Sequence, residues 1–202
     1  MLLPEFLEEL FYVKEINLFE STFKIYLQKV DKYNILETQK WLKGLDKNYT
    51  IQQLKNLKTL YFRNNKLTFI PSLKLSNLPN LQQLYLSNNQ LTSIPSLTLS
   101  NLSNLIELEL SHNQLTSIPN FNLPNLQYLF LNNNQLTSIP SLTLSNLPNL
   151  QEFSLSYNKL TSIPSLSLSN LPNLEILYLS NNQLTEKSKE YVKSLKIKYL
   201  YL

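Results

Sequence analysis

The chain has 202 residues, no cysteine and a formal net charge of +4 at pH 7. The lack of cysteine excludes disulfide-bonded caps and thiol chemistry, and it favours a reducing, intracellular compartment. Most of the excess charge lies at the C-terminal tip, where residues 186–202 carry five Lys and two Glu, so a basic stripe suited to nucleic acid is not expected.

The first residues show no sign of export or membrane insertion. The start Met1–Glu5 has no basic region and is soon followed by Glu8 and Glu9, unlike a signal peptide. No apolar run approaches the length of a membrane-spanning helix. We therefore expect a cytoplasmic protein without a membrane partner.

Residues 1–50 are expected to form a helical N-terminal cap. They lack the repeat that fills the rest of the chain, and their apolar spacing is helical. At their end, Thr50 is followed three residues later by Gln53, which is typical of a capping box that opens a helical turn. A cap is needed because the first core layer of a repeat protein would otherwise face water.

From residue 51 to residue 202 one eleven-residue pattern recurs, L-x-x-L-x-L-x-x-N-x-L. A pattern at this period predicts a solenoid in which each unit buries its apolar edge on its neighbours. Half a repeat precedes the six full copies, and a truncated seventh strand follows them. The copies are spaced by 24, 24, 21, 24 and 24 residues and begin at Leu57, Leu81, Leu105, Leu126, Leu150 and Leu174.

This pattern resembles the leucine-rich repeat family, in the intracellular form that lacks cysteine caps. The chain has no Ala, one Gly and one Arg but many Asn, Lys and Ile, the residues that AT-rich genomes encode. In this respect the repeats are similar to those of AT-rich microbes or large DNA viruses of protists, and a viral protein would act in the host cytoplasm.

Within one repeat, Leu84 and Leu86 share one side while Gln83 and Tyr85 share the other, the alternation of a short strand. Pro95 on the return path opposes a long helix there. The fold class expected is α/β, a right-handed leucine-rich repeat solenoid with a curved parallel β-sheet on its concave face. Its convex side should be irregular or extended, and its N-terminal cap α-helical.

An asparagine ends each strand at the same register. Its amide can donate to and accept from backbone groups that a tight bend leaves unpaired. The predicted structural ladder comprises Asn65, Asn89, Asn113, Asn134, Asn158 and Asn182.

The strand positions that point away from the core combine aromatic rings with carboxylates. Protein recognition surfaces favour aromatic anchors and fixed charges, so a protein or peptide partner is expected on the concave sheet. The alternative is that the rings only satisfy strand propensity and cross-strand stacking. The predicted partner-binding residues are Tyr61, Tyr85, Glu107, Glu109, Tyr128, Phe130, Glu152 and Tyr178.

Catalysis, a metal and a cofactor are not expected. His112 is the only histidine, no Asp occurs in the repeats and no Gly-rich phosphate loop is present. Glu107, Glu109 and His112 are close in sequence, but we interpret them as a charged patch.

A second interpretation concerns residues 3–11. Their sequence, L-P-E-F-L-E-E-L-F, resembles the opening of an F-box, whose members often carry leucine-rich repeats as substrate receptors of ubiquitin ligases. An amphipathic helix that begins with proline explains the same residues.

At the other end, the segment Ile197–Leu202 repeats the strand pattern. An uncovered edge strand invites pairing with a second chain, whereas lysines such as Lys198 discourage it. A monomer is favoured, with an edge-to-edge dimer as the alternative.

Overall fold

The computed structural model describes residues 35–40, 42–45, 47–70, 75, 78–95, 99, 102–140, 144, 146–163, 168 and 171–202. The F-box-like segment 3–11 lies outside these residues, as does most of the predicted cap. Of that cap, residues 35–40 and 42–43 are helical.

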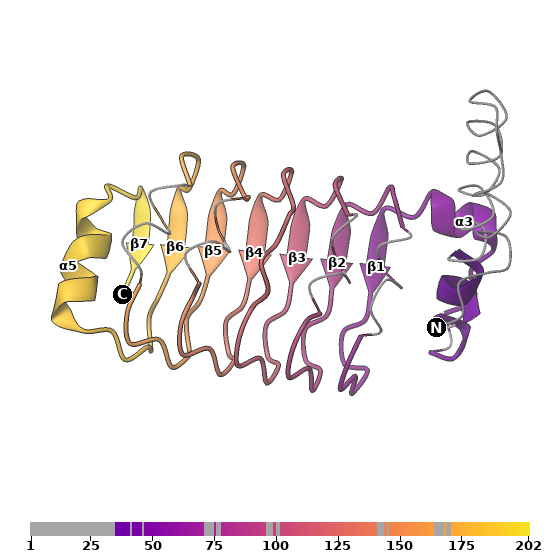
Figure 1. Ribbon diagram of the computed structural model, residues 1–202, viewed down its shortest axis with the longest axis horizontal. Coiled ribbons are helices and arrows are strands. Elements are labelled where there is room, and N and C mark those ends of the chain that lie inside the picture. The colour runs from indigo at the N-terminus through magenta and orange to yellow at the C-terminus, as the bar shows by residue number, and fades with distance from the viewer. Residues whose placement is uncertain are drawn as a thin grey trace, which may run out of the picture.

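The described strands form one parallel sheet in chain order, which appears in Figure 1 as a single row. Equivalent residues pair across each boundary, so that Leu60 lies beside Leu84 and Leu84 beside Leu108. The parallel solenoid predicted from the repeat is confirmed. Its strands are β1 (Thr59–Tyr61), β2 (Gln83–Tyr85), β3 (Glu107–Glu109), β4 (Tyr128–Phe130), β5 (Glu152–Ser154), β6 (Ile176–Tyr178) and β7 (Tyr199–Tyr201).

Apolar side chains from every turn meet in one continuous core. Leu84 and Leu86 are both fully buried, as the alternation predicts. Between strands, the described return residues form turns, bends and irregular segments, apart from helical geometry at Leu75 and Leu168, and Ile94 and Leu102 lie in the same core. In the shorter repeat, the buried Phe121 takes the place of the usual pair of leucines.

Each strand is three residues long, which is shorter than a segment such as Ile197–Leu202 that carries the strand pattern. Cross-strand backbone bonds continue beyond them, as in Phe62 N–H to Tyr85 O at 2.7 Å. The regular geometry then ends at a residue with left-handed backbone. This residue occupies the same register in all six repeats, with φ between 54° and 62°, at Asn64, Asn88, His112, Asn133, Tyr157 and Asn181.

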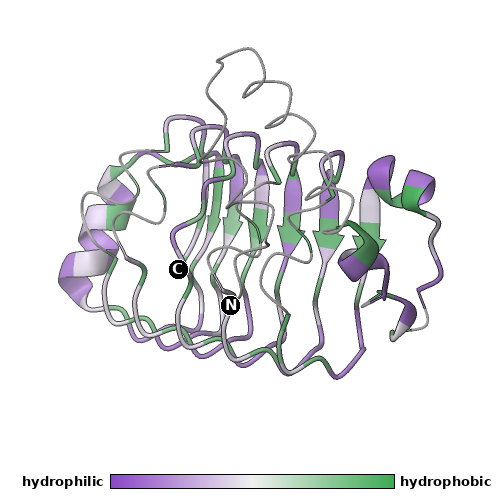
Figure 2. Ribbon diagram, turned by 45° about the vertical axis from the view of Figure 1, so that its right-hand side comes forward, coloured by the Kyte–Doolittle hydropathy of each residue, from purple (hydrophilic) through white to green (hydrophobic). Residues whose placement is uncertain are grey.

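Helices lie at both ends of the row of strands (Figure 1). Helix α3 (Ile51–Lys55) begins with the predicted capping box, in which Thr50 and Gln53 bond each other's backbone N–H groups. Helix α5 (Glu186–Ser194) buries Val192 and carries both hydrophilic and hydrophobic stretches (Figure 2). No helix in the described part of the chain is long and apolar enough to cross a membrane.

Candidate functional site

Each strand presents its first and third residues on the side of the sheet opposite the leucine core. In β1 to β6 the middle residue is buried and the first is half-buried. We call this surface the sheet face. It comprises Thr59, Tyr61, Gln83, Tyr85, Glu107, Glu109, Tyr128, Phe130, Glu152, Ser154, Ile176, Tyr178, Tyr199 and Tyr201. The structure therefore places all eight predicted partner-binding residues on one surface.

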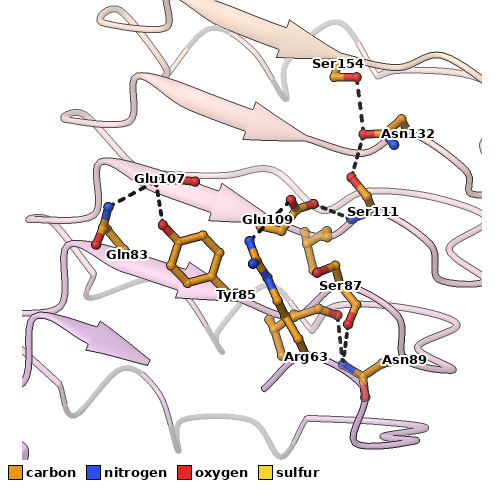
Figure 3. Close-up of polar contacts among 12 residues, drawn as sticks. Arg63, Gln83, Tyr85, Ser87, Asn89, Glu107, Glu109, Ser111, Asn132 and Ser154 are labelled. Atoms are coloured by element: carbon orange, nitrogen blue, oxygen red, sulfur yellow. Dashed lines mark hydrogen bonds and ion pairs between the residues drawn. The ribbon is translucent and has the colours of Figure 1, made fainter. Parts of the chain in front are cut away.

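Glu107 is held by two neighbours from β2. One of its carboxylate oxygens accepts a hydrogen bond from Gln83 Nε2 at 3.1 Å and another from Tyr85 Oη at 2.9 Å (Figure 3). Burial and the hydrogen bond to Glu107 raise the pKa of Tyr85 to about 12. The Tyr85 phenol therefore stays protonated at neutral pH and acts as a fixed donor.

Glu109 is held by the single arginine of the chain. Arg63 Nη2 lies 3.9 Å from one Glu109 oxygen, and the Ser111 N–H donates to the other at 3.0 Å (Figure 3). The Arg63 guanidinium also lies 4.3 Å from the centre of the Tyr85 ring, within the range of a cation–π contact. Arg63 was not among the predicted site residues, although it is the only charged residue at its position in the repeats.

A tyrosine stack lies at each end of the sheet face. The Tyr61 and Tyr85 rings are nearly parallel, with centres 5.0 Å apart. The Tyr178 and Tyr201 rings stack in the same way at 4.6 Å. These stacks are the cross-strand contacts expected if the rings serve only to stabilise the sheet. Tyr61 nevertheless remains 56% exposed, so stacking with Tyr85 leaves much of its surface in solvent.

Glu152 lies between the two stacks and differs from the other two carboxylates. Glu152 lies on β5, and its register neighbours are Tyr128 on β4 and Ile176 on β6. The Glu152 carboxylate makes no hydrogen bond or ion pair with any described residue, whereas the Glu107 and Glu109 carboxylates each have two such contacts. Burial, and then the negative charge of Glu107, raise the pKa of Glu152 above its ordinary value.

The asparagine ladder connects consecutive turns behind the sheet. Asn113 Nδ2 donates to Leu86 O and to Leu110 O, both at 3.0 Å, and its oxygen accepts from Leu91 N at 3.0 Å. Asn89, Asn134, Asn158 and Asn182 make the same set of bonds in their own turns.

Asn65 differs from the other five ladder positions. It is exposed, and its Nδ2 donates to the nearby Arg63 O at 2.9 Å. In the other turns Nδ2 reaches the carbonyl of the residue directly after the strand of the preceding repeat, whereas helix α3 precedes β1 and offers no equivalent carbonyl.

A second asparagine row, missed in the sequence analysis, runs along the opposite edge of the strands. Each member donates through Nδ2 to a backbone carbonyl of the preceding turn at 2.7–2.8 Å. The available signal was an asparagine directly before the first leucine of each repeat. The row comprises Asn80, Asn104, Asn125, Asn149 and Asn173.

His112 lies on the loop after β3, where its Nε2 is 3.4 Å from Asn133 Nδ2. Among the residues that the structure describes, no group of three or more His, Cys, Asp or Glu side chains is arranged to hold a metal ion. The described sheet face thus combines rings, amides and carboxylates on one surface.

Comparison with known families and structures agrees with the repeat geometry. A family model described as "Leucine rich repeat" matches residues 79–135, 124–184 and 148–202. A second, "Leucine Rich repeats (2 copies)", matches residues 55–101. The chain therefore belongs to the leucine-rich repeat family, whose members commonly serve as protein-interaction modules. A search of curated proteins finds no match.

Three similar solved structures illustrate the range of the fold. A chain in the octameric complex of Latrophilin 3, Unc5D and FLRT2 (LRR) is 29% identical, with a TM-score of 0.65, over 69% of this chain and 44% of that one. An LRR protein of Leptospira interrogans is 32% identical, with a TM-score of 0.59, over 75% and 44%. A chain of the TLR13–ssRNA13 complex is 33% identical, with a TM-score of 0.59, over 68% and 20%. The present chain thus spans less than half of each of these proteins.

Proposed function

We propose that this chain is a non-catalytic recognition module that binds a protein or peptide on its sheet face. The observation that carries the proposal is the row of rings along that face. Aromatic residues occupy the third position of five of the seven strands, β1, β2, β4, β6 and β7. Tyr61, Tyr199 and Tyr201 are 46–56% exposed. Exposed aromatic side chains in a row are typical of protein interfaces.

The size and charge of the face support a polypeptide partner. Seven strands at about 4.8 Å spacing give a face roughly 30 Å wide, which suits an interface of about 800 Å² per partner. The face carries Glu107, Glu109 and Glu152, and the nearby Arg63 is already paired with Glu109. This balance opposes a nucleic-acid backbone, which requires basic contacts. One similar structure is a complex of several proteins and another contains ssRNA.

Selection of a random peptide library on the immobilised chain tests the proposal. Selected peptides should lose about tenfold or more in affinity for Phe130→Ala, because truncating a central aromatic anchor typically costs about 2 kcal/mol or more. Tyr85→Ala should also weaken binding. Phe69→Ala is the matched control, since Phe69 is an aromatic residue on the return path and is 66% exposed. Binding that depends on Phe69 and not on Phe130 would contradict the sheet face as the site.

A further inference from the structure

We infer that Glu152 and the rings beside it form a subsite for a cationic side chain, a Lys ammonium or an Arg guanidinium, of the polypeptide that binds the sheet face. This inference rests on the proposed function and specifies the chemistry of its partner. The subsite is the centre of β4 to β6, where the carboxylate lies between Tyr128 and Ile176 in register and interacts electrostatically with Tyr178.

The first support is that the Glu152 carboxylate is not already used. Glu107 accepts two hydrogen bonds, and Glu109 accepts a backbone N–H and pairs with Arg63. Glu152 has no comparable partner among the described residues although it is half-buried. A partly buried carboxylate without a partner loses solvation and gains nothing in return, and an incoming cation would supply that missing contact.

The second support is that two basic groups close to the face, Arg63 and Lys198, are engaged elsewhere. Arg63 lies over the Tyr85 ring and pairs with Glu109, at the other end of the face. Lys198 pairs with Glu175 at 3.6 Å and lies 5.2 Å from the centre of the Tyr199 ring. The uncompensated charge at β5 is therefore negative, and its complement is a cation.

The third support is that tyrosines lie on both strands next to Glu152, Tyr128 on β4 and Tyr178 on β6. Cations bind over the faces of tyrosine rings as well as to carboxylates. Tyr128 flanks Glu152 on β4, and Tyr178 on β6 is held in place by its stack on Tyr201. A carboxylate framed by rings selects an ammonium or guanidinium group with an aliphatic stem, because the stem packs on the rings while the charge reaches the carboxylate. A free inorganic cation has no such stem and therefore lacks the packing contact with the rings.

Matched peptide pools provide the test. Random peptides whose central residue is fixed as Lys, Arg, Gln or Glu are applied to the immobilised chain, and retention of each pool is measured. The Lys and Arg pools should be retained about tenfold more than the Glu pool, as expected for one charge-assisted contact. Glu152→Gln should remove this preference. Glu175→Gln should retain it, because Glu175 lies outside the sheet face and already pairs with Lys198.

The outcomes separate this inference from the proposed function. If Phe130→Ala lowers the retention of every pool while Glu152→Gln leaves the preference for Lys and Arg unchanged, the cation subsite is wrong and the sheet face stands. If the preference disappears only in Glu107→Gln, the subsite is likewise wrong. If Phe130→Ala changes nothing, both proposals fail. Equal urea midpoints for the wild-type chain and the isosteric Glu152→Gln variant at neutral pH, or a higher midpoint for the variant, would show that lost retention is not lost folding.

Discussion

At the scale of single residues, asparagine amides make most of the side-chain hydrogen bonds that join neighbouring turns within the described part of the chain. Asn134, for example, connects Leu110 O, Leu131 O and Leu115 N, and it is buried. Removing such a side chain leaves several buried backbone groups without partners, which costs more than the loss of one exposed hydrogen bond. A ladder amide that bonds buried backbone groups of two turns should therefore contribute more to stability than one that bonds only locally.

We expect Asn134→Ala to lower the free energy of unfolding by about 1–3 kcal/mol. Asn65→Ala should change it by about 0.5 kcal/mol or less, because Asn65 is exposed and bonds only locally through its Nδ2. Urea midpoints of the two variants measure the difference. Equal losses would show that the ladder bonds do not determine the cost.

Tyr157 occupies a left-handed position with φ 57°, where four of the six repeats have asparagine. This conformation disfavours residues other than Gly, Asn and Asp. Tyr157→Asn should therefore stabilise the chain by about 0.5–1 kcal/mol, seen as a higher urea midpoint. Tyr157→Phe keeps the same backbone preference and serves as control. A loss of stability in Tyr157→Asn would mean that the exposed ring makes a contact of its own.

Glu152 gives the stability a defined pH dependence. Its folded-state pKa lies above its ordinary value of 4.5, so the folded state binds the proton more tightly than the unfolded state does. The contribution of Glu152 is therefore most favourable below about pH 4 and is lost as pH rises through the raised pKa. Glu152→Gln should be more stable than the wild-type chain at about pH 7, with no advantage at about pH 4. A stability advantage of Glu152→Gln that grows as pH falls would show that the pKa of Glu152 is lowered on folding and not raised.

At the scale of elements, α5 occupies the return path after β6 and packs on the return path of the repeat that begins at Leu150. Val192 is fully buried, and the buried Ser188 hydroxyl accepts the Ile163 N–H at 3.1 Å. A helix thus replaces both the apolar and the polar contacts that another repeat would supply. The polar outer side of α5 is typical of a terminal cap in a solenoid.

Ser188→Ala should destabilise the chain by about 1–3 kcal/mol, because the buried Ile163 N–H loses its acceptor. Ser194→Ala is a matched control in the same helix, since the exposed Ser194 hydroxyl bonds only Tyr191 O. Chemical denaturation compares the two variants. Similar midpoints would indicate that α5 docks through Val192 and its apolar neighbours alone.

At the scale of the whole molecule, the repeat determined most of what could be predicted. The spacing of leucines such as Leu84 and Leu86 predicted the parallel sheet and the core, because burial on one side of a strand requires that alternation. The left-handed residue after each strand was not predicted. Four repeats have asparagine at this position, but His112 and Tyr157 occupy it in the other two, so the sequence pattern there is not uniform. The contacts of the site depend on side-chain geometry across strands. The sequence contains Arg63, Tyr85 and Glu109 but not the stacking that brings them together.

The central claim is that the sheet face binds the partner, and the cysteine-free chain allows a direct measurement of where binding occurs. A single cysteine is introduced either on the sheet face, as Ile176→Cys, or on the exposed return path, as Thr161→Cys. The rate of thiol alkylation is then measured with and without a saturating peptide selected on the wild-type chain. We expect the peptide to slow alkylation at position 176 by about tenfold or more and to leave position 161 unchanged, because only the former would be covered. Protection at position 161 with none at position 176 would contradict the account.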